Sequence, residues 1–243
     1  RPMTGNPAPP ERIRAMFDRI VPIYDPMNLL ISGFQEPRWR RLLVEAAGVG
    51  PGDRALDVAT GTGKVAAALW RAVQPGGEVV GVDFSERMIA RARARYGDRS
   101  GLTFVVGDAL ALPVPDATFD AATIAFGMRN LTDYRQGFAE MCRAVRPGGR
   151  VACLEIARPR GRLGRAIGRW FDHAVPLLGR LVGAGDAYAY LVRSTRDYPP
   201  PEAIAELMAS VGLADVAWRG LSGGIVTLHV GRRPDARPTH DGR

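Results

Sequence analysis

The sequence predicts an α/β fold with a mostly parallel sheet of seven strands, one of them antiparallel, and helices on both faces. Three observations predict it. A short apolar run, Arg54–Val58, leads into a glycine-rich turn and an alanine-rich helical segment. Strand and helix patterns then alternate as far as Glu155, which favours parallel strands with right-handed crossovers. The last two strands are joined by a short glycine-rich turn, and this hairpin reverses one strand.

Length and composition fit one such domain. The chain has 243 residues, of which 46% are hydrophobic and 24% charged, so it can fill a large core. No apolar run approaches the ~18 residues that span a bilayer, and no signal peptide is visible. Cys142 and Cys153 follow no disulfide pattern and are predicted to be buried thiols. We therefore expect a cytoplasmic protein.

The chain begins with helices that precede the sheet. Residues 1–10 are rich in proline and predicted to be disordered. A single domain is expected over residues 11–232, with N-terminal helices at 11–50, a helical insertion at 158–200 and a disordered tail at 233–243. Within the first region we expect an amphipathic helix Glu11–Ile20, a turn at Tyr24–Asn28 and a helix Leu29–Ala47. The turn is expected to form a lid over the nucleotide site that the glycine-rich turn predicts.

The remaining elements follow in order from their hydrophobic patterns and turn residues. The predicted strands are Arg54–Val58, Glu78–Val82, Leu102–Val106, Phe119–Ala125, Arg150–Glu155, Leu213–Arg219 and Gly224–Val230. The predicted helices are Lys64–Val73, Glu86–Tyr96, Tyr134–Val145 and Glu202–Val211. Ser85 is a suitable helix cap, and Pro147-Gly148-Gly149 is expected to separate a helix from the strand that follows it.

The glycine-rich turn predicts a nucleotide site. Gly61 and Gly63 allow a sharp turn and close approach of a ligand, and the helix that starts there directs free N–H groups toward it. A P-loop is excluded, because Val58 and Val65 stand where glycine and a hydroxyl residue are required. Asp83 lies at the distance expected for a ribose contact, which fits NAD as well as other nucleosides.

Acidic residues at the ends of three strands favour S-adenosylmethionine over NAD. Asp57 would repel a pyrophosphate but can hold an ammonium group, directly or through water. Asp83 can hold a ribose hydroxyl, and Asp108 with Ala109 an adenine amino group. S-adenosylmethionine has these groups and no phosphate. No metal is expected. The predicted cofactor site comprises Tyr24, Asp57, Ala59, Gly61, Thr62, Gly63, Asp83, Phe84, Met88, Asp108, Ala109 and Ala125.

Several further motifs resemble one family. They are Tyr24-Asp25-Pro26-Met27-Asn28 with Ser32 and Trp39, Phe126-Gly127-Met128-Arg129-Asn130, Arg143–Arg150 running to Glu155, and Leu221–Val226 with His229. From about Met16 to Gly231 the chain is similar to class I S-adenosylmethionine-dependent methyltransferases, and more narrowly to the ubiquinone/menaquinone biosynthesis C-methyltransferases (UbiE/MenG type). Glu36 and Lys64 depart from the family pattern, which usually has a histidine and an acid at these positions.

The resemblance implies a Rossmann-like fold and methylation of a ring carbon of a prenylated quinol, with demethylmenaquinol the first expectation and a benzoquinol left open. It marks Arg129 and Asn130 as catalytic. A guanidinium stays protonated, so we expect Arg129 to stabilise a developing phenolate and Asn130 to position a water or the hydroxyl. His229, also predicted to be catalytic, and His173 are the candidate proton acceptors.

The net charge of +8 comes from arginine, since Lys64 is the only lysine, and fits either a GC-rich genome or attraction to an anionic surface. Arginines interleave with apolar residues from Arg158 to Val182, as in a helix that lies on a bilayer, although a core helix with a solvated face fits too. We expect a lipid-tailed quinol as substrate and peripheral association with the inner face of the membrane, and leave a homodimer open.

Three other functions stay open at this point. The first is a methyltransferase of the same fold that acts on a soluble aromatic or natural-product acceptor. The second is an NAD-binding oxidoreductase, because the glycine turn and Asp83 alone fit NAD. The third is a nucleic-acid modifier, which the charge suggests; since the sequence lacks an aromatic and basic groove pattern, we expect no nucleic-acid partner.

Overall fold

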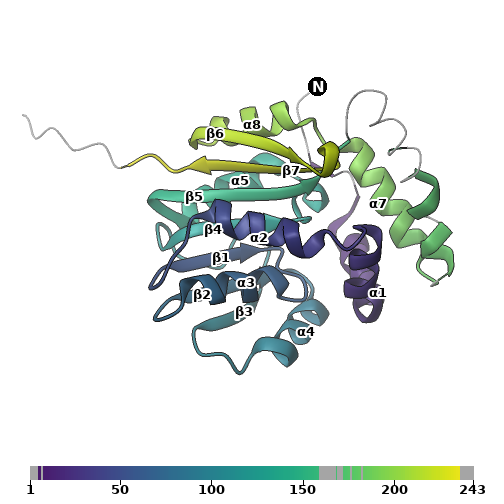
Figure 1. Cartoon of the computed structure of the whole chain (residues 1–243), viewed down its shortest axis with the longest axis horizontal. Helices are drawn as coiled ribbons and strands as arrows, with labels where there is room; N and C mark the ends of the chain where they lie inside the picture. Colours follow the sequence, from purple (N-terminus) through teal and green to yellow (C-terminus); the bar gives the residue numbers. More distant parts are fainter. Residues whose placement is uncertain are drawn as a thin grey trace, which may run out of the picture.

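The computed structural model describes residues 5–6, 8–158, 168, 172–175, 177–181 and 183–235. It shows one sheet of seven strands between two layers of helices (Figure 1). The strands are β1 (Arg54–Val58), β2 (Glu78–Asp83), β3 (Leu102–Val106), β4 (Phe119–Ala125), β5 (Val145–Ile156), β6 (Ala214–Leu221) and β7 (Val226–Arg232). The helices are α1 (Pro10–Ile31), α2 (Glu36–Ala47), α3 (Lys64–Val73), α4 (Glu86–Tyr96), α5 (Tyr134–Ala144), α7 (Gly185–Asp197) and α8 (Pro201–Ser210), with 3-10 turns η1 (Met128–Asn130) and η2 (Ser222–Gly224).

The strand order is β3-β2-β1-β4-β5-β7-β6. Strand β1 pairs in parallel with β2 on one side and β4 on the other, and β7 runs antiparallel to both β5 and β6. The prediction of a mostly parallel sheet with one antiparallel strand is confirmed. From β1 the chain crosses to β2 on one side of β1, and it later returns to β4 on the other side. A crevice therefore forms where β1 and β4 end. Such crevices bind ligands in α/β sheets.

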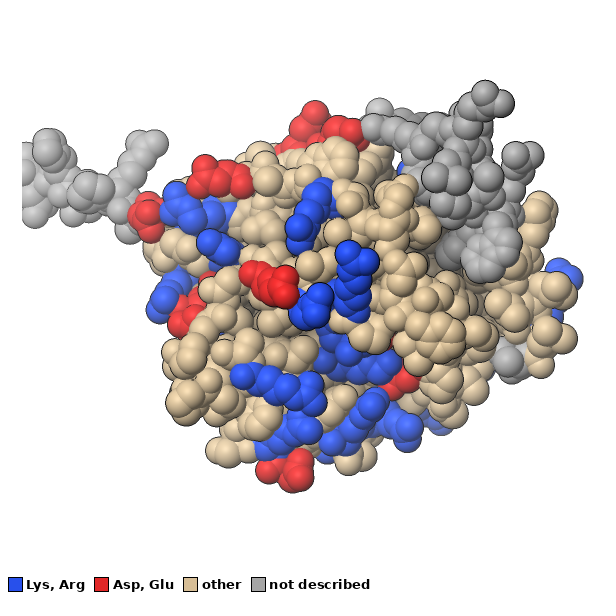
Figure 2. Space-filling view, in the orientation of Figure 1, with Lys and Arg blue, Asp and Glu red and all other residues tan. Residues whose placement is uncertain are grey.

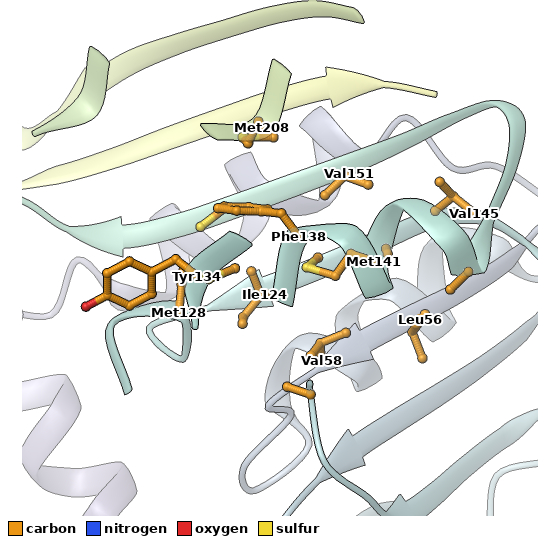
Figure 3. Packing of buried hydrophobic residues seen from close by; sticks show 14 of the residues in the cluster. Leu56, Val58, Ile124, Met128, Tyr134, Phe138, Met141, Val145, Val151 and Met208 are labelled. Atoms are coloured by element: carbon orange, nitrogen blue, oxygen red, sulfur yellow. The ribbon is translucent and has the colours of Figure 1, made fainter. Parts of the chain in front are cut away.

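Both faces of the sheet are covered by apolar helix faces. On one face, Phe138 and Met141 of α5 and Met208 of α8 are fully buried with Leu56 and Ile124 of the central strands (Figure 3). On the other face, α2, α3 and α4 bury a second cluster. The sheet is thereby held rigidly, and its strand ends are fixed platforms for the loops that follow them.

The N-terminal helices differ from the prediction. Tyr24–Asn28 is not a turn but part of α1, which continues through Pro22 and Pro26. Ile13, Met16, Ile20 and Met27 share one face of α1 and pack with α7 in a third apolar cluster. This packing outweighs the backbone penalty of proline inside a helix. The break comes later, at residues 32–35, so the predicted helix Leu29–Ala47 is divided between α1 and α2.

Parts of both predicted disordered tails are ordered. Asn6 is buried, and the N–H groups of Gly5 and Asn6 donate to the carbonyls of Thr132 and Leu131. Near the other end, the Arg233 guanidinium donates to the carbonyls of Cys142, Arg143 and Val145. Composition alone does not show such contacts, because they satisfy backbone groups that lie far away in the sequence.

Strand β5 is longer than predicted. Strand β5 begins at Val145, and its pairing with β4 shifts in register across Pro147-Gly148-Gly149, so these residues form a bulge and not a turn between elements. Most of the basic stretch Arg158–Val182 lies outside the described residues. Within the part of the chain that the structure describes, no helix is long and apolar enough to cross a bilayer.

Candidate active site

Two cavities meet at the ends of β1 and β4. The first, here the strand-end cavity, has a volume of about 360 Å³ and is walled by the residues after β2 and β3. The second, here the lid cavity, has about 310 Å³ and is walled by α1, α2 and α7. They share the wall residues Phe17, Tyr24, Ala59, Gly61, Ala125 and Phe126. A ligand in one cavity therefore lies next to a ligand in the other.

Most of the predicted cofactor residues line the strand-end cavity. They are Tyr24, Ala59, Gly61, Asp83, Phe84, Met88, Asp108, Ala109 and Ala125. The Asp83 carboxylate accepts hydrogen bonds from the N–H groups of Gly61 (2.8 Å) and Ser85 (2.9 Å), which fix its orientation. Burial raises the pKa of Asp83 to about 6. At neutral pH it is an oriented, ionised acceptor for a hydroxyl donor.

Asp57 lines neither cavity, which argues against direct contact with an ammonium group; contact through water stays a prediction. Its carboxylate is buried and accepts from the hydroxyls of Thr60 (2.6 Å) and Thr123 (2.8 Å) and from the N–H of Ala66 (3.1 Å). Burial raises the pKa of Asp57 to about 6, against the effect of these hydrogen bonds. Asp57 therefore stabilises the glycine turn through these hydrogen bonds. The predicted Thr62 lies in the lid cavity, where its hydroxyl donates to Asp25 (2.9 Å).

Gly63 also lines neither cavity, and its role is in packing. Its φ is +82°, and a Cβ there would lie 2.8 Å from Cζ of Phe104 and 3.1 Å from Cβ of Ala92. Glycine is thus required by the close approach of the turn to β3 and α4, and not by contact with a ligand.

Gly63→Ala is expected to lower the free energy of unfolding by about 2–4 kcal/mol, since it adds a steric clash to the strain of a positive φ. Gly76→Ala is the matched control: Gly76 has a φ of +83°, but a Cβ there has no neighbour within 4 Å, so only about 1–2 kcal/mol is expected. Denaturant unfolding of both variants measures the difference. Equal losses would show that the contact with Phe104 does not matter.

The lid cavity contains a buried arginine. The Arg129 guanidinium pairs with Glu155 (Nη1 to Oε1, 2.6 Å) and donates to the carbonyl of Phe126 (2.6 Å), while its backbone N–H donates to the other Glu155 oxygen (3.1 Å). Burial favours the neutral form, but the Glu155 carboxylate, together with Tyr24 and Tyr190, outweighs it and raises the pKa of Arg129. Nε of Arg129 is buried with no hydrogen-bond partner among the described residues. A fixed cation thus lines this cavity, and one of its donors, Nε, has no partner in the described part of the chain.

Asn130 lies beside it, in the wall of the strand-end cavity, within a network that ties down η1. Its side-chain oxygen accepts from the hydroxyl of Tyr190 (3.0 Å). Asn6 donates from its amide to the carbonyl of Arg129 (3.0 Å) and to the hydroxyl of Tyr190. The N-terminal segment and α7 therefore fix the backbone that carries Arg129 and Asn130.

His229 is not at the site, and its prediction as a catalytic residue is wrong. It is fully buried in β7, where its ring stacks on Trp218 and Nε2 lies 2.9 Å from the carbonyl of Pro201. Burial lowers the pKa of His229. Its neighbour Leu228 packs on the α2 side of the sheet, so strand alternation places His229 on the opposite face, toward α8. His173 is exposed and lines neither cavity.

Lys64 ties three elements together at the rim of the lid cavity. Its ammonium lies 3.0 Å from Asp25 of α1 and 3.7 Å from Glu36 of α2. The two residues that depart from the family pattern, Glu36 and Lys64, therefore form an ion pair. In the same region the indole N–H of Trp39 donates to Ser222 (2.9 Å), which joins α2 to the turn before β7.

Some site residues were not predicted. Glu155 stands one residue before the end of β5, an acid close to a strand end like Asp83 of β2, and that signal could have identified it. Asn6, Tyr188 and Tyr190 reach the site only through the packing of the N-terminal segment and α7, and the sequence carries no local signal for them.

Comparisons with known proteins agree with this geometry. A family model described as the ubiE/COQ5 methyltransferase family matches residues 7–233. The ubiquinone/menaquinone biosynthesis C-methyltransferase UbiE of Geobacter sulfurreducens is 44% identical over 229 residues, which cover 92% of this chain and 89% of that protein. The demethylmenaquinone methyltransferase of Thermus thermophilus is 44% identical over 223 residues, which cover 90% and 100%.

The fold is also found in solved structures. A SAM-dependent methyltransferase from Thermotoga maritima superposes with a TM-score of 0.65 at 20% identity, over 90% of this chain and 99% of that one. At this identity the likeness concerns the fold alone. The family model, by contrast, matches nearly the whole chain, and the relatives named above are 44% identical to it. The chain therefore belongs to the ubiE/COQ5 methyltransferase family.

Proposed function

We propose that this enzyme methylates a ring carbon of a reduced prenylated quinol, with demethylmenaquinol as the acceptor. Its cofactor is S-adenosylmethionine, which supplies an electrophilic sulfonium methyl group when bound. Relatives named demethylmenaquinone methyltransferase support the choice of acceptor. The observation that carries the proposal is the apolar lid cavity, which holds a buried arginine and shares a wall with the strand-end cavity.

The strand-end cavity offers the contacts that the nucleoside needs. Asp83 can accept from a ribose hydroxyl, and Asp108 with Ala109 lies where the adenine edge would be held. The Asp108 carboxylate is itself positioned by the N–H of Leu110 (2.9 Å). With the nucleoside so held, the reacting end of the cofactor is directed to the shared wall at Gly61 and Phe126.

The lid cavity suits an aromatic ring with an apolar tail. Its walls include Met16, Ile20, Trp39, Phe126 and Leu154. Its volume of about 310 Å³ lies at the lower end of the range for small-molecule sites. Such a cavity can take a ring and the start of its tail, and the rest of a prenyl chain must leave through the opening.

Arg129 supplies the electrostatic part of the reaction. Loss of a hydroxyl proton to water makes the ring carbon of a quinol nucleophilic, and the negative oxygen so formed needs a cation or donors. The carbon takes the methyl group as S-adenosylhomocysteine leaves, and its own proton is then lost as the ring oxygen is protonated again. Arg129 lines the cavity, and its Nε is buried without a hydrogen-bond partner among the described residues. An oxidised quinone has no hydroxyl proton to lose and an electron-poor ring, so the acceptor must be the reduced form.

The hydroxyl of Tyr188 is a second donor for the acceptor. Tyr188 lines the lid cavity, and its hydroxyl is buried with no hydrogen-bond partner among the described residues. Burial raises the pKa of Tyr188 to about 12, so it stays protonated and can donate to a ring oxygen. Burial likewise raises the pKa of Tyr24 to about 12.

Tyr188→Phe is expected to lower kcat/KM for the quinol about tenfold, as expected for the loss of one hydrogen bond of about 1.5 kcal/mol. Affinity for S-adenosylhomocysteine should not change, because Tyr188 does not line the strand-end cavity. Tyr96→Phe, a buried tyrosine of α4 outside both cavities, is the control and should keep full activity. An unchanged kcat/KM in Tyr188→Phe would remove this residue from the acceptor site.

The proposed function is tested by methyl transfer with methyl-labelled S-adenosylmethionine and demethylmenaquinol that has been reduced and kept free of oxygen. The expected product is menaquinol labelled on a ring carbon, located by NMR, and no product from the oxidised quinone. A demethylated benzoquinol and water-soluble phenols are run in parallel. Label in the soluble phenols but in neither prenylated quinol would contradict the proposal, and so would binding of NAD in place of S-adenosylhomocysteine.

The acceptor of this reaction has an insoluble tail. We therefore place the reaction at a membrane surface, with the enzyme bound peripherally on its inner face. No nucleic acid takes part in it.

A further inference from the structure

We propose that the turn between α1 and α2, residues 32–35, inserts into the surface of an anionic lipid bilayer and forms the entrance for the acceptor. The inference rests on the proposed function, because it concerns the way a lipid-tailed quinol reaches the lid cavity. The proposed contact centres on this turn and not on the arginines of the basic stretch Arg158–Val182.

The two sides of this turn differ in what they contact. Ser32, Gly33 and Gln35 line the lid cavity. Phe34 does not line it and is 68% exposed. The turn is thus a thin wall between the acceptor cavity and the outside, and an aromatic side chain stands on its outer side.

The backbone of Phe34 makes its presence unusual. Its φ is +63°, in the left-handed region, directly after Gly33 at +57°. Bulky residues are rare in this conformation, and glycine adopts it without strain. The chain therefore keeps a strained and exposed phenylalanine where glycine would serve the turn better, which is the kind of local conflict found at functional positions.

Other exposed apolar side chains lie on α1 and on a segment that packs in the same apolar cluster as α1. Leu30, in the last turn of α1, is 47% exposed. Leu177 and Leu181 are 58% and 76% exposed, and their neighbour Leu178 packs into the cluster that holds α1. Phe34, Leu177 and Leu181 are the most exposed of the large apolar residues in the described part of the chain.

The charge beside the turn is complementary to anionic lipid. Arg38 and Arg41 follow it on α2 and are both exposed, although Arg41 also pairs at 3.5 Å with the exposed Glu45. Figure 2 shows basic side chains over α2, next to an uncharged surface at the end of α1. An apolar tip with flanking arginines is the pattern of an interfacial anchor. A second copy of this basic surface would be repelled, whereas anionic headgroups would be attracted.

The test uses Phe34→Gly in the full chain. This change relieves the positive φ, so the thermal midpoint should stay the same or rise. Binding to vesicles of phosphatidylglycerol and phosphatidylcholine should nevertheless weaken about tenfold, and kcat/KM for demethylmenaquinol in those vesicles should fall by a similar factor. Activity on a reduced demethylated naphthoquinol without a tail, in solution, should stay the same, because Phe34 lines neither cavity.

Two controls separate the effects. Ala117→Gly relieves a similar strain, at a φ of +48°, without loss of an aromatic ring. Trp218→Ser removes an aromatic that is 40% exposed on the edge strand β6. Both should bind vesicles as the wild type does. Unchanged vesicle binding in Phe34→Gly would overturn the proposed membrane contact. The proposed function would still stand if the same variant methylates the tail-free quinol.

Two further outcomes would separate the proposed function from the proposed membrane contact. A wild type that binds vesicles through Phe34 but methylates no quinol would contradict the proposed function and leave this surface as a membrane contact. Light scattering that shows a dimer in the wild type and a monomer in Phe34→Gly would identify the turn as an interface between copies of the chain, against the proposal.

Discussion

Arg129→Lys is expected to lower kcat by about 10²–10³-fold, the usual effect of removing one donor to a developing oxyanion. Lysine can keep the charge beside Glu155, but its single nitrogen cannot also replace the unpartnered Nε donor of the guanidinium. Arg129 and Glu155 are 2.6 Å apart and almost fully buried. Rapid-mixing single-turnover measurements with saturating S-adenosylmethionine isolate the methyl-transfer step, and affinity for S-adenosylhomocysteine should remain as in the wild type.

Arg129→Ala tests how much Arg129 contributes to the stability of the fold. It leaves the Glu155 carboxylate buried without its cation, which is expected to lower the free energy of unfolding by about 3–5 kcal/mol. The double variant Arg129→Met with Glu155→Gln removes the charge as well, so stability should largely return while kcat stays low. If Arg129→Lys turns over as fast as the wild type, Arg129 supports the fold and does not act on the acceptor.

Asp83→Asn is expected to weaken binding of S-adenosylhomocysteine about 10–100-fold, which corresponds to a lost hydrogen bond to a charged group of about 1.5–3 kcal/mol. The two carboxylate oxygens accept from the N–H groups of Gly61 and Ser85. An asparagine has one acceptor oxygen, so one of these N–H groups would face an amide NH₂. Isothermal titration measures the change, and Asp98→Asn, an exposed carboxylate of the turn after α4, is the matched control.

The same residue predicts a pH dependence. Burial raises the pKa of Asp83 to about 6, and only its ionised form accepts from a ribose hydroxyl and both N–H groups. Affinity for S-adenosylhomocysteine should therefore be constant above about pH 7 and fall toward tenfold per pH unit below about pH 6. The profile of Asp83→Asn should be flatter in this range. The Asp57 pKa is also raised to about 6, but Asp57 is present in both proteins. Equal slopes would exclude Asp83 as the group that titrates.

The features that the sequence predicted correctly are local ones. The strands β1 to β4 follow from short apolar runs that end in an acid or a glycine, and alternation with helices makes them parallel. Asp83 and Asp108 were placed at the site by the same rule, because parallel strands end at one edge of the sheet. The closing hairpin followed from its glycine-rich turn, and β7 is indeed the antiparallel strand.

The features that were wrong or missed depend on contacts between distant parts of the chain. Proline at 22 and 26 predicts a break, but packing of α1 on α7 keeps the helix intact. His229 was chosen for its chemistry, whereas the pleat of β7 directs it to the far face of the sheet. Asp57 ends its strand as Asp83 does, yet two threonines and a backbone N–H occupy its carboxylate. Residue type and spacing do not contain this information.

The central claim is that the cofactor nucleoside lies in the strand-end cavity, so that its reacting end meets the lid cavity. A crystal structure of the complex with S-adenosylhomocysteine tests it most directly. The ribose hydroxyls should lie within hydrogen-bond distance of Asp83, the adenine beside Ala109, and the sulfur at the wall formed by Gly61 and Phe126. A nucleoside in the lid cavity, or a ribose without contact to Asp83, would contradict this account.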